Sequence, residues 1–240
     1  MIDYSFDWGI IWRQPYGALF LNGIKTTLML SVVAWSLAFF IGMVVSVFRV
    51  STRRSLKLAG AMYVEVFRNI PLLVQIFFWY FALPSLLPKS MELWLYDNIS
   101  NLPFFLGILA LAFYTSSRVS EVFRSSLLSV PYGQYRAAYS TGLTPYKTYR
   151  YVVVPYAFRL SIPPLTTEFL TCFKNSALTM TIGVLEITGT TAYIESFTWR
   201  GLEVTTAASF SYLAITLCII AFMAIVEKKT RIAGMIHQER

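Results

Sequence analysis

Charged side chains stand inside some of the most apolar stretches of this sequence. Arg118, Glu121 and Arg124 follow one another at intervals of three residues, and on an α-helix residues with that spacing lie within reach of each other. A charge at the centre of a bilayer costs at least about 2.5–3.5 kcal/mol, so charges in spanning helices pair, face the bundle interior or line a polar path. The triplet predicts either an internal set of salt bridges or part of a route for a charged solute.

Arg118 is the member of the triplet that best suits a ligand. The planar guanidinium group of arginine binds a carboxylate through two parallel hydrogen bonds. If Glu121 pairs with Arg124, Arg118 is free to meet a carboxylate, and Thr115 offers a hydroxyl in the same polar stretch. The alternative is that all three charges only fix helix packing.

A second polar set follows a long apolar stretch further along the chain. Lys174, Asn175 and Ser176 precede a run rich in Ser and Thr. These three residues are candidates for the same path, with Lys174 as a second cation. The alternatives for Lys174 are that it extends to the membrane interface or pairs with Glu168, a long reach at six residues' separation.

Glu65 and Arg68 are the charges of an earlier apolar stretch. Their spacing of three residues predicts that they pair with each other, as packing or gate residues. The single histidine, His237, lies near the C-terminus, and both cysteines, Cys172 and Cys218, stand in apolar sequence. A histidine-based catalytic centre, a metal site and a disulfide are therefore not expected, and neither is a cofactor.

The elements that hold these charges are predicted to be membrane-spanning helices. Hydrophobic residues make up 56% of the 240 residues and charged residues 13%, against about 25% charged in an average soluble protein. A spanning helix needs roughly 20 mostly apolar residues. Five stretches qualify, at about 22–48, 62–86, 104–128, 151–180 and 206–226. The prediction is an all-α membrane protein with five transmembrane helices in a single domain over 1–240. The stretch 182–196 is either re-entrant or a pair of short helices.

Basic residues gather in alternate loops of this five-span arrangement. One side holds the basic clusters within 49–57, 136–150 and 228–240, whereas the other side holds only Arg13, Lys25, Lys89 and Arg200. Because cytoplasmic loops collect Lys and Arg, this places the C-terminus in the cytoplasm and the N-terminus outside. The same bias accounts for the net charge of +8 without a nucleic-acid partner.

The long cytoplasmic loop at 129–150 carries a short helical pattern. Its central part has no helix breaker, and Pro and Gly residues bound it on both sides. Tyr135, Tyr139 and Leu143 recur every four residues and form an apolar stripe, and an Ala-Ala pair lets another backbone approach closely. A helix of this kind packs either on a partner protein or on the lipid interface.

The loop and the segment after it contain the pattern Ala137-Ala138-x3-Gly142-x9-Val152-x-Val154-Pro155. This pattern resembles the EAA loop of ABC-importer permeases, except that Arg136 replaces the family's usual Glu. In that family the loop forms a coupling helix that sits in a groove of the ATP-hydrolysing subunit and transmits its motion to the spans. On this resemblance, the ATPase-coupling residues are Gln134, Tyr135, Arg136, Ala137, Ala138, Tyr139, Gly142, Leu143 and Pro155.

Further motifs resemble permeases for polar amino acids in particular. They are Tyr63-Val64-Glu65-Val66-Phe67-Arg68-Asn69-Ile70-Pro71, Glu121-x-x-Arg124, Pro131-x-Gly133-Gln134, Pro163-Pro164 and Lys174-Asn175-Ser176-Ala177-Leu178. The Arg118-x-x-Glu121 spacing and the basic C-terminal tail look most like the glutamate/aspartate importers. On this resemblance the framework charges are Glu65, Arg68, Glu121 and Arg124. A preference for a particular substrate would then lie at Arg118 and Lys174.

The resemblance implies a type I ABC importer permease in the bacterial inner membrane, working by alternating access. It implies as partners an ATP-binding subunit dimer, an extracytoplasmic amino-acid-binding protein and a second, distinct permease, together with membrane lipid. The chain itself is not expected to be an enzyme, because it has no phosphate-binding Gly-x4-Gly-Lys-Ser/Thr loop. Import of glutamine or of a basic amino acid is one alternative, and an ion-coupled transporter or channel is another.

Overall fold

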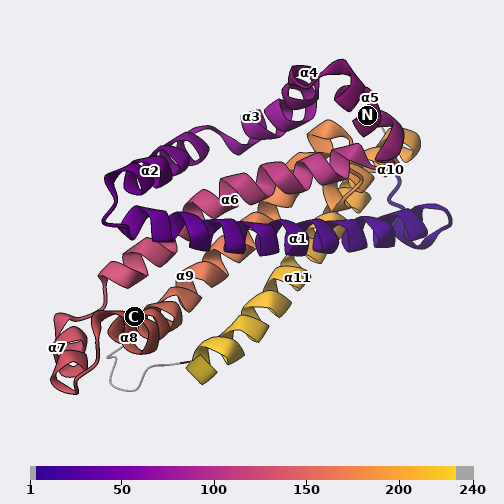
Figure 1. Cartoon of the computed structure of the whole chain (residues 1–240). Helices are drawn as coiled ribbons and strands as arrows, with labels where there is room; N and C mark the ends of the chain where they lie inside the picture. The colour runs from indigo at the N-terminus through magenta and orange to yellow at the C-terminus, as the bar shows by residue number, and fades with distance from the viewer. Residues whose placement is uncertain (1–3, 231–240) are drawn as a thin grey trace.

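Helices account for all the regular secondary structure in residues 4–230, the part of the chain that this computed structural model describes (Figure 1). The α-helices are α1 (Tyr16–Val50), α2 (Arg54–Asn69), α3 (Leu72–Phe77), α4 (Leu83–Leu86), α5 (Lys89–Asn98), α6 (Leu102–Leu128), α7 (Tyr132–Ser140), α8 (Pro145–Thr148), α9 (Val154–Asn175), α10 (Ile187–Thr198) and α11 (Gly201–Thr230). Short helical stretches of other pitch lie at Ile10–Trp12, Phe78–Ala82, Tyr149–Val153 and Ser176–Ile182.

Within the described residues, three helices are long and apolar enough to cross a membrane. They are α1, α6 and α11, which contain the predicted spans at 22–48, 104–128 and 206–226. Two bent pairs meet the same criteria when each pair counts as one span: α2 with 72–86, and 145–182 with α10. The structure therefore confirms an all-helical chain with three clear apolar spans and allows up to five.

The predicted single helix over 62–86 is wrong, because the chain bends by 102° after α2. Pro71 has no N–H to donate and disfavours a helical conformation in the residue before it, and Ile70 is accordingly extended (φ −84°, ψ 129°). The side-chain amide of Gln75 donates to the carbonyls of Phe67 (2.8 Å) and Ile70 (2.9 Å). This amide satisfies carbonyls that the end of a helix leaves without partners.

The stretch 182–196 forms a tight turn followed by one short helix, α10. Gly183 has a φ of +87°, which glycine adopts at little cost, and it ends the helical stretch after α9. Ile187 and Ile194 of α10 are fully buried, in one cluster with Phe20 and Val204. Because Phe20 belongs to α1 and Val204 to α11, α10 is part of the bundle core.

α1 and α6 pack closely along a stripe of small residues. Ala34, Ala38 and Gly42 recur at intervals of four residues on α1, and all three are buried. A β-carbon on Gly42 would lie 2.6 Å from Cγ1 of Val119 and 3.0 Å from the backbone oxygen of Ser116. Small residues at helix contacts let membrane helices approach closely, so this pair forms the tightly packed centre of the bundle.

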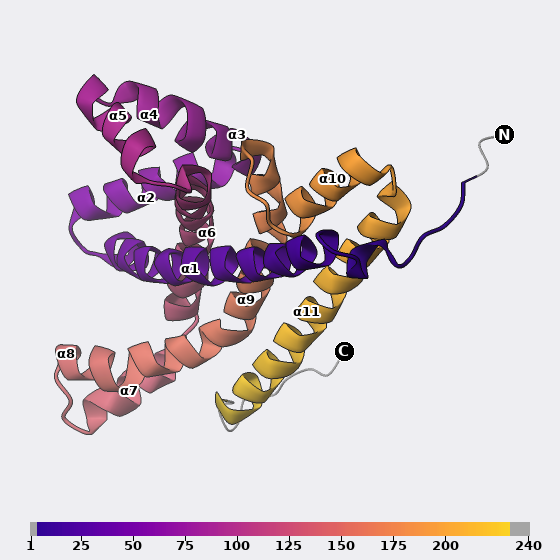
Figure 2. The same cartoon turned by 90° about the vertical axis from the view of Figure 1, so that its right-hand side faces the viewer.

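The most apolar part of α11 lies at the edge of the molecule. None of the residues in its most hydrophobic stretch is buried, and its C-terminal half diverges from α1 (Figure 2). An apolar groove of about 830 Å³ separates it from α1 and α9. This face is left for lipid or for another protein chain.

Candidate functional site

Glu121 is the centre of an ion-pair network near the C-terminal end of α6. Its carboxylate binds Arg124, whose Nε lies at 3.0 Å, and it also binds Arg49 at the end of α1. The predicted Glu121–Arg124 pair is confirmed. Sequence reasoning treated Arg49 as a loop cation and missed this contact, because 72 residues separate it from Glu121. The network joins α1 to α6, as a packing role requires.

Arg118 is bound by a carboxylate of the protein itself. Its Nε lies 2.5 Å from Oε2 of Glu168, and its Nη2 lies 3.0 Å from Oε1. Because Glu168 belongs to α9, the pair bridges α6 and α9. The prediction that Arg118 is either free or held by Glu121 is wrong for this conformation. The alternative pairing of Glu168 with Lys174 is also absent from the described residues.

Arg68 does not pair with Glu65, contrary to prediction. The Glu65 carboxylate instead accepts a hydrogen bond from Nδ2 of Asn69 at 2.8 Å. Within residues 4–230, no carboxylate lies within ion-pair distance of Arg68. Its side chain is exposed at the last turn of α2, where the helix dipole favours a cation.

Charged residues from three helices meet at a small pocket of about 210 Å³. Its charged lining residues are Arg68 from α2, Arg118 and Glu121 from α6, and Glu168 from α9. At about 30 Å³ per water the pocket has room for roughly seven waters, which is the scale of a small polar solute. Arg118 is paired with Glu168, and Glu121 binds two arginines that do not line the pocket.

The other predicted path residues lie outside this pocket. Thr115 and Ser176 are buried, and Oγ of Ser176 donates to a backbone carbonyl one turn earlier at 2.7 Å. Lys174 is exposed and Asn175 is half-buried, and neither lines the pocket of Arg118. The structure therefore separates Arg118 from the other candidates, whose place on a path stays a prediction.

The predicted helix in the long loop is present as α7 (Tyr132–Ser140). It begins directly after Pro131, and the chain turns at Gly142, whose φ is +80°. The Tyr135 ring packs on the Tyr149 ring, with centroids 6.0 Å apart, and burial raises the pKa of the Tyr135 hydroxyl above its ordinary value. α7 is thus fixed to the segment that leads into α9.

One side of α7 faces the protein and the other is open. Ala138 is 5% exposed, and Tyr135 and Leu143 are half-buried, so only part of the predicted apolar stripe points outward. The exposed residues of the predicted coupling set are Gln134, Arg136, Ala137, Tyr139, Gly142 and Pro155. Of the Ala-Ala pair, only Ala137 is open to another protein.

Sequence reasoning missed Glu186, which is fully buried at the start of α10. Its carboxylate accepts the N–H of Gly189 at 2.8 Å and the hydroxyl of Tyr212 at 2.6 Å. The Thr27 hydroxyl of α1 accepts the N–H of Ile187 at 3.0 Å beside it. The network ties α1, α10 and α11 together. Glu is not among the residues preferred at a helix N-cap, so no clear signal for this role was present in the sequence.

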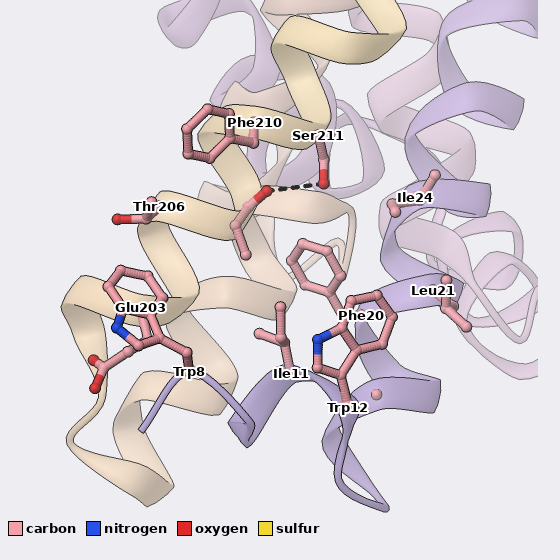
Figure 3. Close-up of a pocket in the computed structure, with 12 residues that line it drawn as sticks. Trp8, Ile11, Trp12, Phe20, Leu21, Ile24, Glu203, Thr206, Phe210 and Ser211 are labelled. Atoms are coloured by element: carbon pink, nitrogen blue, oxygen red, sulfur yellow. Dashed lines mark hydrogen bonds between the residues drawn. The ribbon is translucent and has the colours of Figure 1, made fainter. Parts of the chain in front are cut away.

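Glu203, also missed, holds the N-terminal segment against α11. Its buried carboxylate accepts the N–H of Asp7 at 2.8 Å and the hydroxyl of Tyr4, and the bond to Glu203 raises the pKa of Tyr4 above its ordinary value. Figure 3 shows the adjoining pocket of about 400 Å³, where Trp8 and Trp12 face residues of α1 and α11. Its lining is mostly aromatic and aliphatic, which suits packing rather than chemistry.

Comparison with known protein sequences identifies the family. The model of the family described as "binding-protein-dependent transport system inner membrane component" matches residues 37–232. Glutamate/aspartate import permease protein GltJ of Escherichia coli (strain K12) is 37% identical over 97% of this chain and 98% of its own length. Glutamine transport system permease protein GlnP of the same strain is 30% identical, over 95% of this chain and 99% of its own.

Solved structures agree with this match. A chain in a crystal structure of an amino acid ABC transporter with histidines has a TM-score of 0.82 and 29% identity, covering 94% of this chain and 100% of that chain. A chain of the inward-facing MetNI methionine ABC transporter has a TM-score of 0.75 and 18% identity, and the match covers 92% of this chain and 100% of that chain. At this identity the match shows likeness of fold alone.

The chain therefore belongs to the family of binding-protein-dependent transport system inner membrane components. The resemblance to ABC-importer permeases that the sequence motifs indicated is confirmed. It is a multi-pass protein of the bacterial inner membrane, and its fold is that of ABC-importer permeases.

Proposed function

We propose that the chain is the membrane-spanning permease subunit of an ATP-driven importer of polar amino acids, with glutamate and aspartate as its substrates. The observation that carries this proposal is α7, a short helix in an EAA-type sequence whose Ala137 side is open to a partner. Similarity to GltJ supports acidic substrates, and the pocket that Arg68 and Arg118 line agrees with them. ATP hydrolysis belongs to a partner subunit.

The proposed topology has five spans, with α2–α4 and α9–α10 each forming one bent span. Arg49, Lys57 and Arg124 line one pocket together with Tyr135 of α7, so the basic ends of α1, α2 and α6 lie beside α7. In both views the C-terminal end of α11 lies toward the same side as α7, away from the N-terminal segment (Figures 1 and 2). The positive-inside rule makes that side cytoplasmic and the N-terminus external.

The proposed mechanism is alternating access between this chain and a second permease, a distinct homologue. Five spans of one chain do not enclose a path, and the unburied apolar face of α11 supports a contact with another chain or with lipid. Closure of the ATPase dimer would push on α7. Because Tyr135 packs with Val130, Val153 and Ala157, that push would reach both α6 and α9. A binding protein on the outer face would deliver the substrate.

The test is uptake of labelled glutamate and aspartate into proteoliposomes that hold the assembled complex, with the binding protein on its outer side. We expect uptake that requires hydrolysable ATP on the ATPase side. Movement of substrate down its gradient without nucleotide would contradict the ABC-importer assignment. ATP-dependent uptake of glutamine or arginine, without glutamate or aspartate, would contradict the assignment of substrate alone.

A further inference from the structure

The Arg118–Glu168 pair has the geometry with which proteins hold a carboxylate ligand. Two guanidinium nitrogens each contact a different carboxylate oxygen, at 2.5 and 3.0 Å, and such two-pronged pairs combine strength with a defined orientation. The Arg118 side chain is nevertheless 34% exposed, whereas that of Glu168 is 12% exposed. Since both residues line the polar pocket, a carboxylate that enters it meets Arg118 beside Glu168.

Within residues 4–230, the two cations that line this pocket differ in their pairing. Arg68 lines it without a carboxylate of its own, and Glu121 is shared by Arg49 and Arg124. Arg118 is held by Glu168, which leaves Arg68 as the lining cation without a carboxylate in the part of the chain that the structure describes. A solute with two carboxylates can bind both lining cations, Arg68 and Arg118. A solute with a single carboxylate leaves one cation uncompensated.

We propose that Glu168 occupies the position on Arg118 that a substrate carboxylate takes during transport, and that Arg68 receives the second carboxylate of an acidic amino acid. This rests on the proposed function and names Glu168 and Arg68 as specificity-determining residues. The exchange keeps Arg118 paired at each stage, with Glu168 when the pocket is empty and with substrate when it is loaded. Breaking the pair outright would leave two shielded charges without partners, which is strongly unfavourable. The exchange leaves only the Glu168 carboxylate without one, and that carboxylate lines the polar pocket.

The fold supplies a way to drive this exchange. Arg118 lies on α6 and Glu168 on α9, and the segment containing α7 is the direct connection between these two helices. A displacement of α7 therefore acts on the helices that carry the two partners. Arg118 and Glu168 are paired when the pocket is empty. The segment with α7 connects this pair to the proposed ATPase contact.

The test measures binding of labelled glutamate to the purified permease–ATPase complex without the binding protein. Glu168→Gln keeps the size of the side chain and removes the competing charge, so glutamate should bind about tenfold tighter, the effect of losing one charge-assisted competitor. Arg68→Gln should weaken glutamate about tenfold and leave glutamine binding unchanged. Glu195→Gln, an exposed residue of α10 that does not line the pocket, should change neither.

Arg118→Gln should abolish glutamate binding, but it leaves Glu168 unpaired and risks loss of the complex. The double variant Arg118→Gln with Glu168→Gln leaves no unpaired charge, so it should assemble and hydrolyse ATP at the basal rate while failing to bind glutamate. A purely structural pair predicts that this double variant binds glutamate as the wild type does.

Three results would overturn the inference: no gain in affinity in Glu168→Gln, retained binding in the double variant, or no saturable binding to a wild-type complex that imports glutamate. A wild-type complex that does not import acidic amino acids with ATP and its binding protein would instead refute the proposed substrate. The two failures are therefore distinguishable.

Discussion

The side-chain amide of Gln75 donates to the carbonyl of Ile70 across the proline that ends α2, at 2.9 Å. Gln75 is 4% exposed, so water does not compete for this bond, and the same amide also donates to Phe67 at 2.8 Å. The end of α2 therefore lies in the bundle with these two carbonyls satisfied. The 102° bend that follows is stabilised by a side chain from the next helix.

Replacing Gln75 with Leu should destabilise the protein, because it removes both donors from shielded carbonyls. Leaving such groups unsatisfied costs about 1–3 kcal/mol, which in a chain of this size lowers the melting temperature by about 2–12 °C. The measurement is thermal unfolding of the purified complex. Asn98→Leu is the matched control, because its exposed amide makes a similar bond to a carbonyl, at 2.9 Å on α5, and its effect should stay within about 0.5 kcal/mol. Equal melting temperatures for the two variants would contradict the role of Gln75.

Gly42 should be intolerant even of alanine, because its position on α1 lies against Val119. The added β-carbon would lie 2.6 Å from Cγ1 of Val119, and overpacking of this kind costs about 1–3 kcal/mol. Gly133→Ala on α7 is the control, and it should stabilise the protein rather than destabilise it. No atom lies within 4 Å of its β-carbon position, and Ala is favoured over Gly inside a helix by about 0.5–1 kcal/mol. Unfolding of the two variants in parallel checks the difference. A Gly42→Ala protein as stable as Gly133→Ala would show that α1 and α6 can separate without loss.

Sequence patterns that act over one or two helical turns predicted the structure well. The length of α6, the Glu121–Arg124 pair and the helix at α7 all follow from local spacing, polarity and breakers. Pro71 was also visible, but the apolar run on both sides of it favoured a single span, and the bend became clear only from the extended backbone at Ile70.

Contacts between distant parts of the chain could not be predicted from local sequence spacing. Arg118 and Glu168 are 50 residues apart, and nothing in the spacing around either one indicates the other. Glu186 and Glu203 were passed over because each stands in a moderately apolar stretch near a predicted loop, whereas their burial results from the packing of α1, α10 and α11. Local spacing identifies which charges occur in spans, but the packing of helices decides which of them pair.

The two neighbouring alanines of α7 should respond differently to the same substitution. Ala138 is 5% exposed, so Ala138→Glu buries a charge and should lower the yield and melting temperature of the permease itself. Ala137 is exposed, so Ala137→Glu should leave the melting temperature unchanged and weaken attachment of the ATPase subunit at least tenfold, because a charge is placed in the proposed contact. Co-purification of the ATPase subunit and unfolding of the permease measure the two effects separately. An Ala137→Glu permease that binds the ATPase normally and transports at the wild-type rate would place the contact elsewhere.

The bond between Tyr212 and Glu186 should stabilise the packing of α11 on α10. The Tyr212 hydroxyl donates to the buried carboxylate at 2.6 Å and lies 3.1 Å from the Thr188 hydroxyl, so Tyr212→Phe should cost about 0.5–3 kcal/mol. In a Glu186→Ala background the same change should cost much less, and the difference between the two costs gives a coupling energy of about 0.5–3 kcal/mol. Tyr193→Phe, an exposed ring on the same α10, should shift stability by less than about 0.5 kcal/mol in either background. Unfolding of the four proteins of the cycle measures the coupling. If the costs simply add, the carboxylate of Glu186 acts only as a cap for α10, and α11 is held to the bundle by its apolar contacts alone.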